Sequence, residues 1–442
     1  MALTGRAPLL VLLGVVLAVA WPGWGAFWTW SALSLVLLAL DVLLAASPKR
    51  LLLQRLPMPA VRLGNPRESE LMLVNSGSRR VRGVLRDGWQ PSAGARHDRH
   101  LLDVAAGERR RLSTELVPTR RGDRLADRVT VRTRGPLGLA GRQRSSAVPG
   151  RLRVLPPFTS RKHLASRLSR LRELDGRSAV MHRGQGTEFD SLRDYVDGDD
   201  VRSIDWRASA RRQSVVIRTW RPERDRRVVF VLDTSRTSAA RIGATQTRSV
   251  GDAAGVEVRL DAAIEAALLT AALAARAGDR VDLIAFDRHV RARVRGSHRG
   301  DLLPNLVEAL APLEASLVEA DWDAVATEVR RLARQRSLVV LLTALDSSVL
   351  DSGLLGVLEQ LASRHTVVLA AVDDPALRAL ARGRGSATDV YTAAAAETAD
   401  AERTRTAQLL TRLGVEVVHA APDELAPALA DRYLALKAAG RL

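Results

Sequence analysis

The chain has 442 residues, an apolar share of 46 %, a formal net charge of +18 and no cysteine. This length predicts two or three domains with ordinary buried cores. The lack of cysteine excludes disulfides, zinc–thiolate sites and thiol catalysis.

The positive charge is concentrated in one part of the chain. Residues 1–50 carry three basic and one acidic residue, residues 51–229 carry 39 and 20, and residues 230–442 carry 25 and 28. Nearly all the basic residues are arginines, which codon composition alone can explain. The alternative is attraction to anionic lipid beside the apolar N-terminus. No zinc-finger spacing or aromatic RNA-binding motif accompanies the arginines, so we expect no nucleic-acid partner.

Residues 1–50 contain two apolar runs, 8–21 and 26–47, which predict a hairpin of two transmembrane helices. The second run is long enough to cross a hydrocarbon core of about 30 Å, whereas the first is short. A cleaved signal peptide is the competing interpretation, but a second apolar run follows at once. Tryptophans typical of a membrane interface surround the turn, and basic residues follow the second run. These residues are Trp21, Trp24, Trp28, Trp30, Lys49, Arg50 and Arg55.

The positive-inside rule then predicts a multi-pass protein of the cell membrane with residues 51–442 in the cytoplasm. Asp41 is the one acid within the second run. It is either a functional intramembrane carboxylate or a residue of helix packing or of an interface. Residues 51–158 consist of short alternating runs separated by Gly, Asn, Asp and Pro, which predict antiparallel strands and a small β-sandwich.

Residues 159–226 form a basic connector followed by an unusual segment. Residues 182–222 combine glycines, acids, arginines and aromatics without a long helical or strand period, and no phosphate-binding GxxxxGK[ST] loop occurs. We interpret this segment as a charge-paired arm that is anchored by its aromatics, packs on the following domain and contributes to a partner surface. The residues assigned this structural or partner-binding role are Tyr195, Gly198, Asp199, Asp200, Arg202, Asp205, Trp206 and Arg211.

Motifs in this segment resemble those of the bacterial domain-of-unknown-function 58 family. The similar stretches are GQGTEF at 184–189, RDYVDGDDVRSIDW at 193–206, the Ala210–Arg211 pair, LDTS at 232–235, RRG at 120–122 and GPLGL at 135–139. The resemblance implies a von Willebrand factor A-like domain without an established biochemical activity. It also implies frequent pairing with MoxR-type AAA+ ATPases encoded nearby.

Residues 227–442 alternate strand-like and helical runs, which independently predicts a mostly parallel sheet with helices on both faces. The strand-like runs are 227–233, 280–286, 337–343, 366–372 and 414–419. In such sheets ligands gather at the carboxyl ends of the strands, and Asp233 lies at such an end.

Asp233, Ser235 and Thr237 have a spacing that suits a hard cation such as Mg²⁺, although the same residue types are common in turns. A metal site of the von Willebrand A type resembles DxSxS, a threonine on a second loop and an aspartate after a later strand. The second loop offers only Ser316 or Asp321. Ala344 stands where the later aspartate is expected, with Thr343 before it and Asp346 two positions after it.

We therefore predict a degenerate site, empty or weakly occupied by Mg²⁺, and no certain cofactor. The chain contains no HExxH and no GxSxG motif, and His289, His298 and His365 are near no activated nucleophile. We expect a non-enzymatic, membrane-anchored interaction scaffold that works with a MoxR-type ATPase in the assembly or maturation of other proteins. The first alternative is a lipid- or envelope-associated structural protein that binds through its basic sandwich. The second alternative is a hydrolase.

Overall fold

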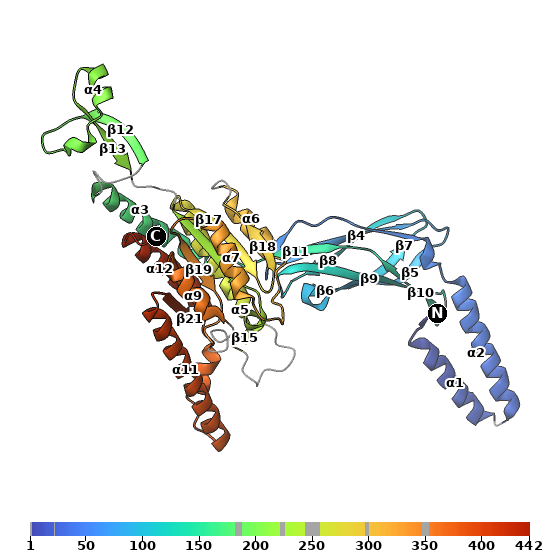
Figure 1. Ribbon diagram of the computed structural model, residues 1–442. Coiled ribbons are helices and arrows are strands. Elements are labelled where there is room, and N and C mark those ends of the chain that lie inside the picture. The colour runs from blue at the N-terminus through green and yellow to red at the C-terminus, as the bar shows by residue number, and fades with distance from the viewer. Residues whose placement is uncertain are drawn as a thin grey trace. The chain divides into compact units, whose positions relative to one another are not determined.

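The computed structural model describes residues 2–21, 23–181, 188–221, 226–243, 257–296, 300–346 and 353–442. Gly184, Gly186 and His298, which the sequence analysis names, lie outside these ranges. The chain divides into two compact units, Met1–Leu155 and Pro156–Leu442, each of which has its own core (Figure 1).

The first unit begins with two apolar helices, α1 (Arg6–Ala20) and α2 (Trp24–Leu44). They meet at Gly14, where an added Cβ would lie 2.0 Å from Cδ1 of Trp30. Most of the large apolar side chains on both helices are exposed. Within the described residues, one segment, Trp24–Arg50, is long and apolar enough to cross a membrane, and the apolar run of α1 is shorter. The structure thus supplies one candidate span rather than the two predicted.

Asp41, near the end of α2, is fully buried and satisfied by the backbone of a turn in the sandwich. Its Oδ1 accepts from the Leu137 N–H over 2.7 Å, and its Oδ2 accepts from the Leu139 and Ala140 N–H groups over 2.7 and 2.8 Å. The turn fits closely, because a Cβ on Gly135 would lie 2.1 Å from Asp41 Oδ1. Asp41 therefore acts as a residue of an interface, the second of the two roles considered for it.

The rest of the first unit is a two-sheet β-sandwich, as the alternating runs predicted. A seven-stranded sheet runs in the order β1-β10-β9-β11-β3, with β5 paired to β9 and β7 paired to β5. Its strands are β1 (Ala2–Leu3), β3 (Val61–Arg62), β5 (Val81–Trp89), β7 (Arg99–Val104), β9 (Gly122–Arg134), β10 (Ala140–Ala147) and β11 (Arg151–Leu155). The second sheet contains β2 (Leu51–Arg55), β4 (Arg67–Asn75), β8 (Arg109–Leu116) and β6 (Ala95–Arg96), and the short helices are η1 (Pro48–Arg50) and η2 (Pro91–Ala93).

Alternate residues of these strands point inward and form the core, in which Leu71, Leu73 and Leu85 are almost fully buried. A buried ion pair connects the two sheets. The guanidinium of Arg55 donates to both carboxylate oxygens of Asp87, over 2.6 and 3.0 Å, and lies 4.7 Å from the Trp89 ring centroid.

The second unit contains a six-stranded sheet in the order β18-β17-β14-β19-β20-β21, in which only β18 is antiparallel to its neighbour. Its strands are β14 (Arg227–Asp233), β17 (Arg280–Phe286), β18 (Val290–Val294), β19 (Leu338–Leu342), β20 (Thr366–Val372) and β21 (Glu416–Ala420). The central strands are buried on both faces, which explains their continuous apolar runs.

Helices cover both faces of this sheet: α5 and α12 lie on one face and α7 and α9 on the other. The helices of this unit are α3 (Leu164–Met181), α5 (Arg259–Arg276), α6 (Leu302–Leu310), α7 (Trp322–Leu332), α9 (Leu355–Ala362), α10 (Pro375–Leu380), α11 (Ala387–Arg412) and α12 (Pro422–Ala438), with η3 (Thr159–His163) and η5 (Arg236–Ala239). A two-stranded ribbon, β15 (Arg241–Ile242) with β16 (Glu257–Val258), leads into α5.

The prediction of a mixed α/β chain with a β-rich N-terminal region and a long apolar helix is confirmed. The segment from 188 to 221, hereafter the arm, contains regular structure that the sequence analysis missed. It consists of a hairpin, β12 (Glu188–Asp194) and β13 (Val216–Arg221), with η4 (Val201–Ser203) and α4 (Trp206–Arg212) between the strands. Its strands are short and irregular, with a bulge after Phe189, so no alternating period revealed them.

Candidate functional site

The candidate site lies where β14 ends and its chain enters a loop. Asp233 is the last residue of β14, and the following residues turn into η5. Asp233 is 1 % exposed and Ser235 is 2 % exposed, although both are polar. Because a buried carboxylate requires partners, its hydrogen bonds define the site.

The Asp233 carboxylate accepts three hydrogen bonds from the chain itself. Oδ1 accepts from the Ser235 N–H over 2.7 Å, and Oδ2 accepts from the hydroxyls of Thr237 and Thr343 over 2.8 and 2.6 Å. The Asp233 carbonyl accepts from the Ser238 hydroxyl over 2.7 Å. The Asp233 carboxylate is thus surrounded by amide and hydroxyl donors of its own chain.

Thr343, the first residue after β19, faces Asp233, and Ala344 does not. Ala344 packs in the apolar cluster between the sheet and helices α7 and α9. The sequence pattern predicts the later aspartate at Ala344, but a carboxylate there would enter the apolar core. The position that would deliver a second carboxylate to Asp233 is 343.

The loop that contains Ser316 and Asp321 contacts the site through its backbone. The Ser316 N–H donates to the Thr234 carbonyl over 2.7 Å, but the Ser316 hydroxyl donates to Asp287 Oδ2, also over 2.7 Å. Asp321 accepts from the Ala324 N–H and caps α7 instead of facing Asp233. Neither side chain that the sequence offered as a second ligand therefore contacts the Asp233 carboxylate.

Asp287 follows β17 at the same edge of the sheet. Burial alone would raise the pKa of the Asp287 carboxyl. Hydrogen bonds from the His289 N–H and the Ser316 hydroxyl, together with the charge of Arg291, outweigh that effect and lower the pKa. Asp287 is consequently a charged, hydrogen-bonded residue of the loop structure.

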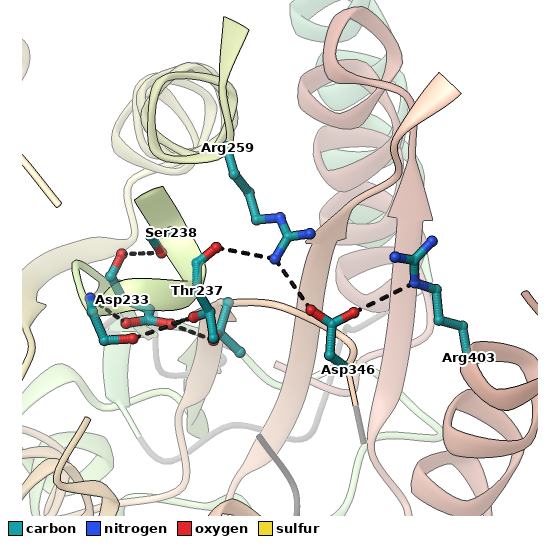
Figure 2. A network of polar contacts seen from close by, with 8 residues as sticks. Asp233, Thr237, Ser238, Arg259, Asp346 and Arg403 are labelled. Atoms are coloured by element: carbon teal, nitrogen blue, oxygen red, sulfur yellow. Dashed lines mark hydrogen bonds and ion pairs between the residues drawn. The ribbon is translucent and has the colours of Figure 1, made fainter. Parts of the chain in front are cut away.

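Asp346, the acid two positions after Ala344, pairs with two arginines (Figure 2). Its Oδ2 lies 3.4 Å from Nη1 of Arg259, and its Oδ1 lies 3.4 Å from Nε of Arg403. The same Nη1 of Arg259 donates to the Thr237 carbonyl over 3.0 Å. Arg259 thus connects the loop after β14 to Asp346, and it places a fixed positive charge next to the site.

The donor set fits a divalent cation poorly. Asp233 brings one carboxylate, and the remaining oxygens are the hydroxyls of Ser235, Thr237 and Thr343, with 3.2 Å between those of Ser235 and Thr237. Across the described ranges no group of three or more His, Cys, Asp or Glu side chains could hold a metal. Affinity for a hard cation rises with the number of charged ligands, so a single carboxylate beside Arg259 favours weak binding at most.

Sequence reasoning did not find Arg259 or Arg403. Arg403 lies on α11, 57 residues after Asp346, and arginine is abundant throughout the chain. The only signal for Arg259 was its place at the first position of α5, directly after β16. An arginine at the start of a helix is unfavourable for the helix dipole and usually has another partner.

The arm, by contrast, is organised by the acids that the sequence singled out. Asp205 caps α4 by accepting from the Ala208 N–H over 3.0 Å, and Asp200 caps η4 by accepting from the Arg202 N–H over 3.0 Å. Asp199 accepts from the Val196 N–H over 2.9 Å. Gly198 has a φ of +103°, a conformation that glycine adopts readily.

Two of these acids also form ion pairs, although with other arginines than expected. Asp199 pairs with Arg193 and Asp205 with Arg218, whereas Arg202 and Arg211 are exposed. The hydrogen bond from Arg193 holds the pKa of Asp199 below its usual value. The hydrogen bonds from the Ala208 N–H and Arg218 do the same for Asp205.

The arm buries Val216 and Ile217 of β13, but several of its other apolar side chains face solvent. Trp206 is 68 % exposed, and Val196 and Val201 are similarly exposed, whereas Tyr195 is half-buried. The sequence analysis predicts that the aromatics anchor the arm. Trp206 does not do so by burial. Its exposure leaves the partner-binding half of that prediction as the one to test.

A family model matches the part of the chain that contains the arm and the Asp233 loop. Residues 191–411, half of the chain, match the family described as "Protein of unknown function DUF58". The chain belongs to this family. The match to DUF58 includes most of the arm, the Asp233 loop, Asp346 and Arg403, and it does not include the sandwich.

Other comparisons add little to the DUF58 assignment. No curated protein matches the chain. Among solved structures, the ASH/PapD-like domain 7 of human CEP192 has a TM-score of 0.17 and 17 % identity, covering 24 % of this chain and 89 % of that one. The PilB minor pilin of Streptococcus sanguinis has a TM-score of 0.34 and 10 % identity, covering 82 % and 89 %. Similarities this low carry no functional argument.

Proposed function

We propose that this DUF58 protein is a membrane-anchored, non-enzymatic scaffold. In this proposal its second unit is a von Willebrand A-like domain with a degenerate metal site. The arm binds a protein partner, a MoxR-type AAA+ ATPase that acts in the assembly or maturation of other proteins. The exposed Trp206 on an arm held by internal caps is the observation that carries the proposal.

Membrane anchoring is supported by the exposed surface of the N-terminal helices. In the most apolar window of Trp24–Arg50 only 28 % of the residues are buried, so this segment differs from the core helix of a soluble protein. Its exposed leucines and valines would remain in water without a bilayer. Transfer into lipid is favourable for such side chains.

The contacts at the two ends of the helical segment support a hairpin that crosses the bilayer twice. Ala2–Leu3 pairs with β10, and the Thr4 hydroxyl donates to the Gly138 carbonyl over 2.6 Å. Asp41, at the other end of the segment, binds the same turn. Since both ends are fixed to one turn, an inserted α1 and α2 would leave and return on the same side. Together with the basic residues that follow α2, this arrangement favours a cytoplasmic location for both units.

The partner surface is argued from pre-organisation. Asp199, Asp200 and Asp205 satisfy backbone N–H groups of the arm, and two of them also hold arginines, so they are already occupied. The large apolar side chains that the arm exposes, among those the structure describes, are Trp206, Val196, Val201 and Val215. Large exposed aromatics such as Trp206 are typical of the centre of a protein interface.

The test is binding of the full chain, in detergent or nanodiscs, to the purified MoxR-type ATPase of the same organism. We expect Trp206→Ala to weaken binding roughly 30-fold, the loss typical of an interface hot spot of about 2 kcal/mol. Tyr391→Ala is the matched control, because Tyr391 is an exposed aromatic on α11 outside the arm. If the Trp206→Ala and Tyr391→Ala variants bind the ATPase equally tightly, the arm is excluded as the contact surface.

The alternative function, a lipid- or envelope-associated structural protein, is supported by the concentration of positive charge in residues 51–229. It predicts the opposite outcome of the same experiment: association that survives changes in the arm and fails when arginines of the sandwich are neutralised.

A further inference from the structure

The junction between α2 and the sandwich is built as a rigid connection. Besides the three hydrogen bonds of Asp41, the Thr133 hydroxyl donates to the Ala46 carbonyl over 2.9 Å and Arg142 Nε donates to the Val42 carbonyl over 3.0 Å. Arg79 Nη1 reaches the Leu44 carbonyl over 3.2 Å. These bonds satisfy carbonyls that the end of a helix leaves without partners. An inserted α2 would therefore hold this end of the sandwich next to the membrane.

Five exposed basic residues surround this junction, and we call them the collar. Arg6 lies beside Gly138, since a Cβ there would approach its Nη1 to 3.3 Å. Arg134 precedes the glycine that contacts Asp41, and two residues of η1 follow α2 directly. The collar consists of Arg6, Lys49, Arg50, Arg79 and Arg134.

Within the described residues, no carboxylate pairs with the collar. In the part of the chain that the structure describes, none of its five residues forms an ion pair. The acid at the junction, Asp41, is buried and already accepts three N–H groups. Leu137, on the turn that Asp41 binds, is 44 % exposed and adds an apolar side chain among the charges.

We propose that the collar binds the phosphate groups of anionic phospholipids in the leaflet next to the end of α2, with Leu137 inserted between the headgroups. This inference rests on the membrane anchoring proposed above and adds the chemistry of the lipid. Basic residues close to such a leaflet attract anionic lipid, and the attraction decays within a Debye length. Only residues held next to the bilayer contribute, so the location of the collar matters more than the total charge.

The test reconstitutes the full chain in bilayers of phosphatidylcholine and phosphatidylglycerol. Electron spin resonance of spin-labelled lipids then measures the relative association of the two lipids with the protein. We expect a preference for phosphatidylglycerol that decreases with added salt. Lys49→Gln/Arg50→Gln/Arg134→Gln should reduce that preference by up to about fivefold for each charge in contact with headgroups.

The control is Arg96→Gln/Arg120→Gln/Arg128→Gln, which removes the same charge from exposed sandwich arginines outside the collar. It should leave the preference unchanged. Equal losses in both triple variants, or no preference in the unmodified chain, would overturn the collar proposal. If the chain immobilises neither lipid, it is not inserted in the bilayer. That outcome would overturn the proposed membrane anchoring.

Discussion

Replacing Thr343 by aspartate should convert the Asp233 site into a divalent-cation site. The Thr343 hydroxyl is 2.6 Å from Asp233 Oδ2, so the new carboxylate would lie within about 4 Å of the first. Two like charges at that distance repel by roughly 4 kcal/mol at an effective dielectric constant of about 20. In the presence of a chelator, we expect Thr343→Asp to lower the melting temperature of the second unit by roughly 10 °C.

Magnesium should reverse much of that loss. A ligand at about 100 times its dissociation constant stabilises the folded state by about 2.7 kcal/mol. The assay is thermal unfolding of the full chain in detergent, with chelator or with millimolar MgCl₂. Thr343→Asn is the control, because it removes the hydroxyl without adding charge and should not respond to Mg²⁺.

The unmodified chain should also show little response, since its Asp233 is satisfied by Ser235, Thr237 and Thr343. Calorimetry of the unmodified chain is the decisive check. Micromolar or tighter Mg²⁺ binding that Asp233→Ala abolishes would show that the existing oxygens already form a metal site and that the reasoning is wrong.

Three further predictions concern stability and the arm. Because the pKa of Asp287 is lowered in the folded state, its carboxylate stabilises the fold above the unfolded pKa of about 3.9, and this stability is lost as the pH falls through the folded pKa. When the free energy of unfolding is measured against pH, Asp287→Asn should therefore lose less stability in acid than the unmodified chain. Asp87→Ala should cost about 3–5 kcal/mol in urea unfolding, because it leaves the Arg55 guanidinium buried, with its side chain only 2 % exposed. A loss below 1 kcal/mol would mean that water reaches that pair. Asp205→Ala should cost α4 about 1 kcal/mol and speed hydrogen exchange of its amides, while exchange in β14 stays unchanged.

The centre of the sheet of the second unit was predictable because β14, β17, β19 and β20 are short apolar runs buried on both faces. The run 227–233 coincides with β14, and 280–286 coincides with β17. The edge strand β18 was missed because only one of its residues is buried, so VRARV lacks a continuous apolar run. Edge strands commonly carry charged residues of this kind.

The candidate site was predictable only in its local part. Asp233, Ser235 and Thr237 are close in sequence, and their mutual contacts follow from the turn. Which residue after β19 faces them depends on the register of β19 against β14, where a shift of one position exchanges the two sides of the sheet. The resemblance to the von Willebrand A pattern places the expected aspartate at Ala344, but it does not fix that register, and Thr343 is the residue that faces Asp233. The arginines that hold Asp346 come from distant helices and have no local pattern.

The bridge from Arg259 to Asp346 has a consequence for regulation. A divalent ion at such an edge dissociates when its concentration falls, so a domain that depends on one can be switched by chelation or supply. A guanidinium attached to α5 cannot leave, and its charge is independent of the ionic composition of the compartment. Any control over this edge would then have to come from movement of the helices that carry the two arginines, α5 and α11, rather than from the availability of a metal.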